Sequence, residues 1–104
     1  MQLTSKFDEA PWQRASDLAR FKRIESEGYV IRLLQLDAGF EESDWCDKAH
    51  IGYVVEGELQ VTFQDGVRTL CAGDVLTTLH GPASAHRGAV NHGTVTLFLV
   101  DPPQ

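Results

Sequence analysis

The sequence has little cysteine, little methionine and no long apolar run. Its 104 residues include two cysteines, Cys46 and Cys71, and one methionine. Two cysteines are too few for a disulfide scaffold. No apolar stretch approaches the roughly 18 residues of a membrane span, and the first twelve residues contain none that could serve as a signal peptide. We therefore expect a cytoplasmic protein with reduced thiols and no membrane partner.

Basic residues are also scarce. Nine Lys and Arg stand against 15 Asp and Glu, which gives a formal net charge of −6. Proteins bind nucleic acids and anionic membrane surfaces largely by neutralising phosphates with Lys and Arg. The charge balance therefore predicts no nucleic-acid partner.

The composition is that of a single globular domain. Apolar residues make up 42% of the chain and charged residues 23%, and a chain of this length has room for one modest core. Residues 1–20 differ from the rest. We expect them to form a short N-terminal arm, with a turn of helix at residues 15–20, and residues 21–104 to form one β domain.

Short runs with the period of a strand fill the rest of the chain. Leu59, Val61 and Phe63 alternate with polar residues, as in a half-buried strand. Asp65-Gly66 predicts a type I′ hairpin turn, and residues 25–28 predict another hairpin between strands at 23–24 and 29–36. Further strands are expected at residues 51–55, 67–71, 75–79, 87–90 and 94–100. Eight or nine short strands with frequent turns favour an all-β sandwich or barrel.

Two segments resemble the two sequence motifs of the cupin superfamily. In the first, Gly57 sets the register. His50 then stands in the place of the motif's acid, and Cys46 and Asp44 stand in the places of its two histidines. In the second, Gly73-Asp74 leads through residues 79–81 to His86, in the place of the last metal-binding histidine.

The phrases IGYVVEGELQVTF and AGDVL also look like those of small single-domain bacterial cupins of unassigned function. The resemblance covers residues 28–101. It implies a cupin jelly-roll barrel of two antiparallel sheets and a homodimer, in which the N-terminal arm with Trp12 is a candidate dimer element. It does not imply one reaction, because one fold can support many functions.

Each of the four motif positions carries a residue that can bind a metal. A thiolate and two imidazoles suit zinc, and they also accept nickel, iron or copper. We therefore expect a divalent transition metal on Cys46, His50 and His86. Asp44 is either a fourth ligand or an orienting carboxylate. The alternative is a metal-free pocket in which His50 only forms hydrogen bonds.

Two functions follow from these alternatives. The first is a metalloenzyme, an oxidoreductase or isomerase, that acts on a small polar molecule. The second is a metal-free module that binds or senses a small ligand without catalysis. Arg32 either reaches the cavity to bind an anionic ligand or faces outward. We expect Glu41 and Glu42 to be solvated, Cys71 to lie in the core, and Gly52 to leave space beside His50.

Overall fold

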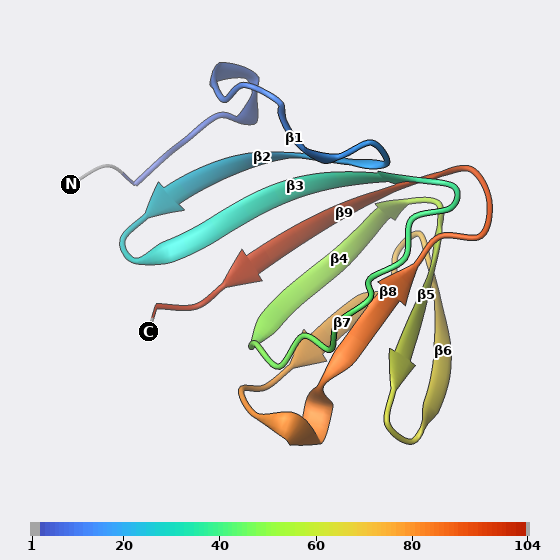
Figure 1. Ribbon diagram of the computed structural model, residues 1–104. Coiled ribbons are helices and arrows are strands. Elements are labelled where there is room, and N and C mark those ends of the chain that lie inside the picture. The colour runs from blue at the N-terminus through green and yellow to red at the C-terminus, as the bar shows by residue number, and fades with distance from the viewer. Residues whose placement is uncertain (1–2, 104) are drawn as a thin grey trace.

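The computed structural model describes residues 3–103, which form two antiparallel β-sheets (Figure 1). The six-stranded sheet has the order β1-β2-β3-β9-β4-β7, and the three-stranded sheet has the order β6-β5-β8. The strands are β1 (Gln13–Ser16), β2 (Ala19–Ser26), β3 (Tyr29–Asp37), β4 (His50–Glu56), β5 (Glu58–Phe63), β6 (Gly66–Cys71), β7 (Val75–Thr78), β8 (His86–Ala89) and β9 (Thr94–Asp101). This confirms the all-β jelly roll. The sheets do not close into one hydrogen-bonded barrel.

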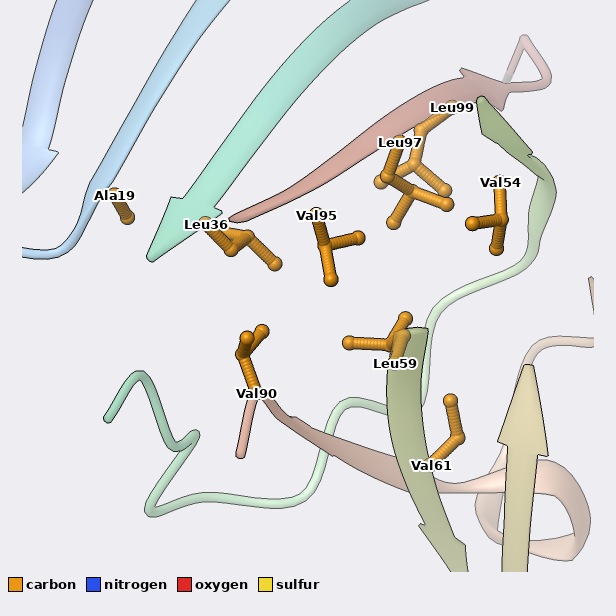
Figure 2. Packing of buried hydrophobic residues seen from close by; sticks show 9 residues of the cluster. All are labelled: Ala19, Leu36, Val54, Leu59, Val61, Val90, Val95, Leu97 and Leu99. Carbon is orange, nitrogen blue, oxygen red and sulfur yellow. The ribbon is translucent and has the colours of Figure 1, made fainter. Parts of the chain in front are cut away.

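The core lies between the two sheets. Side chains from both sheets point into the space between them (Figure 2). The buried cluster consists of Ala19, Leu36, Val54, Leu59, Val61, Val90, Val95, Leu97 and Leu99. The inward residues of β9 are every second one, as strand geometry requires.

The N-terminal segment forms a strand where a turn of helix was expected. β1 pairs with β2, which begins at Ala19 and continues past residue 20. The helical prediction for residues 15–20 was wrong, because Ala19 pairs with Leu36 of β3 and is buried in the core. A 3-10 helix, η1 (Phe7–Glu9), precedes β1. Its Phe7 ring meets the ring of Phe98 edge-on at 6.2 Å, so this part of the arm packs on its own sheet.

The type I′ turn occurs at a different hairpin from the one that Asp65-Gly66 indicated. Such a turn needs positive φ at both central residues. Glu27 and Gly28, between β2 and β3, have φ values of 51° and 83°. In the β5–β6 hairpin, Gly66 already pairs with Phe63 as the first residue of β6. Asp65 is not among the described residues with positive φ.

Cys71 is exposed, although the sequence suggested a core position. It is the last residue of β6, the edge strand of the smaller sheet. Leu70 packs against the core, and side chains alternate along a strand. Cys71 therefore faces outward. Both cysteines are free. Within residues 3–103, no helix is long and apolar enough to cross a membrane.

Candidate metal centre

Three side chains with metal-binding atoms converge between the sheets. Atoms of Cys46, His50 and His86 all lie within 4.8 Å of one another. His50 opens β4 and His86 opens β8, while Cys46 lies in the segment before β4. The amide of Cys46 donates to the carbonyl of His86 at 2.8 Å, and the amide of His86 donates back at 3.0 Å. This pair of backbone bonds fixes Cys46 opposite His86.

The ring of His50 is oriented by a carboxylate. Its Nδ1 lies 2.6 Å from Oδ1 of Asp101, the last residue of β9. Its backbone amide donates to Oγ1 of Thr78 at 3.0 Å. A carboxylate accepts a proton from the ring and therefore favours the tautomer with hydrogen on Nδ1. The lone pair on Nε2 is then directed to the side of Cys46, whose Sγ lies 3.3 Å away.

The ring of His86 is oriented by a backbone carbonyl. Its Nδ1 donates to the oxygen of Ser84 at 3.1 Å. The rings of His50 and His86 meet edge-on with their centroids 5.5 Å apart, and both residues are buried. In each histidine the Nδ1 atom is thus engaged, and Nε2 is the nitrogen left for another partner.

This donor set fits a divalent transition metal. Histidines that ligate a metal usually donate their other ring N–H to a carboxylate or a carbonyl, as both rings do here. Zinc bonds of about 2.0–2.3 Å in tetrahedral geometry place a sulfur and a nitrogen ligand about 3.5 Å apart. The 3.3 Å between Cys46 Sγ and His50 Nε2 is close to this value. Three protein ligands leave a position open for water or a ligand.

The cluster lines a cavity of about 310 Å³. Much of its wall is apolar and is shared with the core. Four charged side chains outside the cluster also line it, namely Arg32, Glu42, Lys48 and Asp101. Nη2 of Arg32 donates to both carboxylate oxygens of Asp101, at 3.3 and 3.2 Å. Of the two orientations considered for Arg32, the structure therefore shows the inward one.

Comparison with solved structures identifies the fold. A cupin described as RmlC-like, from Shewanella frigidimarina, superposes with a TM-score of 0.78 over 100% of this chain and 94% of that one, at 18% identity. A sugar phosphate isomerase of the cupin superfamily from Silicibacter pomeroyi gives 0.80 over 97% and 76%, at 16% identity. The chain has the cupin fold. A predicted oxalate decarboxylase from Thermotoga maritima gives 0.81 over 98% and 100%, at 15% identity.

No protein-family model and no curated protein sequence matches this chain significantly. Identities of this size establish the fold only. The similar structures include a protein described as an isomerase and one described as a predicted decarboxylase, so the fold does not select a reaction.

Asp44 lies apart from the other three candidate ligands. It is exposed, and it lines a separate surface hollow together with Ser16 and Leu18. Residues two apart share a face only in an extended strand, whereas residues 44–46 form no strand and have only an isolated bridge at Cys46. The structure thus brings together Cys46, His50 and His86 but not Asp44.

Sequence reasoning missed Asp101, although the strand period contained a signal for it. Val95, Leu97 and Leu99 face the core, and two further residues along β9 the same face carries Asp101. Ile51 pairs with Val100, so the next pair in register joins His50 to Asp101. A carboxylate at an inward-facing position of β9, opposite a histidine on the neighbouring strand, is the signal that would have indicated Asp101.

Glu42 was also misjudged, because it is half-buried rather than solvated. Its Oε1 accepts a hydrogen bond from the amide of Gly88 at 2.9 Å and lines the cavity. Gly52 has a different role from the one expected. A Cβ there would lie 2.9 Å from Cδ2 of Leu99. The side chain of Leu99 therefore fills the space next to Gly52, so Gly52 does not provide space beside His50.

Proposed function

We propose that this cupin holds a divalent transition metal on Cys46, His50 and His86, and that it binds or transforms a small polar molecule in the adjoining cavity. Zinc is the favoured metal, while nickel, iron and copper suit the same ligands. The observation that carries the proposal is the arrangement of both imidazoles. Each has Nδ1 engaged outside the cluster, and the three ligand atoms lie within 4.8 Å of one another.

Side chains of the chain itself would orient a metal ligand and set the charge of the cavity wall. Asp101 holds the ring and the tautomer of His50 through the 2.6 Å contact. Arg32 and Lys48 place positive charge on the cavity wall, and Glu42 places a carboxylate there. A bound divalent metal supplies a Lewis acid that polarises an oxygen of the ligand or lowers the pKa of bound water. This supports a metal-dependent enzyme of oxidoreductase or isomerase type.

The second candidate is a metal-free binding or sensing module. One observation favours it: Cys46 Sγ lies 3.3 Å from His50 Nε2, a contact that a neutral thiol and an imidazole form as a hydrogen bond without any metal. In that case the cavity binds a small ligand, and substitution of Cys46 or His86 leaves its affinity nearly unchanged.

Elemental analysis of tag-free protein separates the two candidates. We expect about one equivalent of a transition metal in the wild type and less than about a tenth in Cys46→Ala and His86→Ala. The reason is that the affinity of a three-ligand site for its metal depends on every ligand. His80→Ala is the matched control, since His80 is exposed and lies outside the cluster. A wild type with less than about a tenth of an equivalent contradicts the metal site and supports the binding module.

We also propose that the protein is a cytoplasmic homodimer. Four large apolar side chains on the outer face of β4 and β7, those of Ile51, Tyr53, Val55 and Val75, are each exposed by 45% to 61%. A contiguous apolar patch of this kind is typical of an interface. Sedimentation equilibrium would give twice the 11.5 kDa of the chain for a dimer, and a mass of one chain would contradict the proposal.

A further inference from the structure

One hydrogen-bond donor of the Arg32 guanidinium lacks a partner within residues 3–103. Nε of Arg32 is buried and has no hydrogen-bond partner among the described residues. Only Nη2 of the same guanidinium is used by Asp101. A buried donor without an acceptor is unfavourable, and more so when it belongs to a charged group. An acceptor supplied from outside the chain would therefore stabilise this N–H group.

Arg32, the residue that carries this donor, lines the same cavity as the candidate metal ligands. Arg32, Asp101, His50 and the other two ligand residues all line it. Oδ1 of Asp101 contacts both Nη2 of Arg32, at 3.3 Å, and Nδ1 of His50, at 2.6 Å. Arg32 is thus joined to His50 through a single carboxylate. A small molecule in this cavity can contact the Arg32 edge and the metal position together.

The charges around the cavity favour an anion with one negative charge. The cations Arg32 and Lys48 are matched by the carboxylates Glu42 and Asp101. A divalent metal on the thiolate of Cys46 leaves one positive charge, which a single carboxylate neutralises. A phosphate dianion would exceed this balance, and Glu42 and Asp101 would repel the surplus charge.

We propose that Arg32 binds the carboxylate of the ligand, and that the ligand is a small aliphatic acid with a second oxygen for the metal position. This inference rests on the proposed metal site for the second contact and for the net positive charge of the cavity. The rest of the cavity wall fits an aliphatic body, because it is built from side chains such as Leu36, Phe40, Leu59 and Leu97. A volume of about 310 Å³ is at the lower end for ligand pockets.

The test compares an acid with its neutral amide. Isothermal titration calorimetry would measure 2-hydroxybutyrate and 2-hydroxybutyramide on zinc-loaded protein, with zinc content determined on each sample. In the wild type we expect the acid to bind about tenfold more tightly than the amide or better, because a charge-assisted hydrogen bond is lost with the amide. In Arg32→Gln the two affinities should differ by less than about twofold, with zinc content unchanged.

Arg14→Gln is the matched control. It removes the same charge from the exposed strand β1, where Arg14 donates to the backbone carbonyls of Ser16 and Asp17 and does not line the cavity. We expect it to keep the preference for the acid. If Arg32→Gln does not fold, the Arg32 Nε–H resonance of the wild type is followed by nuclear magnetic resonance. The acid should shift it downfield and the amide should not.

Four results would overturn the inference. They are equal binding of acid and amide by the wild type, binding of neither, an undiminished acid preference in Arg32→Gln, and Arg32-dependent binding of inorganic phosphate more tightly than the acid. The zinc measurement keeps the two proposals separate. If the wild type holds no zinc, the metal site fails, and the ratio of acid to amide affinity on the zinc-free protein still decides the role of Arg32.

Discussion

Hydrogen bonds to two ring nitrogens determine what the histidines of the cluster can do. Asp101 and the carbonyl of Ser84 each engage an Nδ1 atom, so the two Nε2 atoms are the ones available inside the cavity. The motif spacing led to Cys46, His50 and His86 because it records positions along strands. It contained no information on Asp101, which lies beyond both motifs near the end of the sequence.

Replacing Asp101 by Asn tests the orientation of His50. The neutral amide oxygen of Asn accepts the hydrogen bond from His50 Nδ1 more weakly than the carboxylate does. The affinity for zinc should therefore fall about 10- to 100-fold. Competition with a chromophoric chelator measures it. Asp65→Asn is the control, because Asp65 forms only an exposed pair with Arg68. Unchanged affinity in Asp101→Asn would show that the carboxylate does not support the metal ligand.

At the scale of elements, β4 lies in the six-stranded sheet and delivers His50 to the cavity. A strand at residues 51–55 was expected from the sequence, and buried and exposed residues alternate along β4. The N-terminal strand was not foreseen, because β1 is exposed along its whole length and its pairing with β2 comes from the tertiary context. The turn after β4 depends on Gly57, which has a φ of 89°.

Substitution of Gly57 should therefore destabilise the fold strongly. A Cβ there would overlap the carbonyl oxygen of Thr94, so Gly57→Ala adds a backbone clash to the unfavourable φ. We expect a loss of at least about 3 kcal/mol in urea unfolding.

Gly73→Ala is the matched control for this prediction. Gly73 has a similar φ of 96°, and a Cβ there would meet nothing within 4 Å. Its loss should be about 1–2 kcal/mol, the cost of the left-handed backbone alone. Equal losses in the two variants would show that the contact with Thr94 carries no energy.

At the scale of the whole molecule, one apolar core and one cavity share the space between the sheets. Leu36, Leu59, Val61, Leu97 and Leu99 belong both to the buried cluster and to the cavity wall. The sequence predicted the all-β class because alternation and turns are local signals. It could not show which wall residues meet across the sheets, since that depends on strand order.

A core substitution tests this shared packing. Leu59→Ala removes a side chain that is 3% exposed and should cost about 2–5 kcal/mol in urea unfolding. Val67→Ala, on the outer face of β6 and 59% exposed, should change stability by less than about 0.5 kcal/mol. A similar small change in both variants would contradict the assignment of Leu59 to the core.

X-ray absorption at the zinc edge of the zinc-loaded protein tests the metal centre most directly. The account predicts one sulfur at about 2.3 Å, from Cys46, and two imidazole nitrogens at about 2.0–2.1 Å, from His50 and His86. A zinc shell without sulfur, or with fewer than two imidazoles, would contradict it.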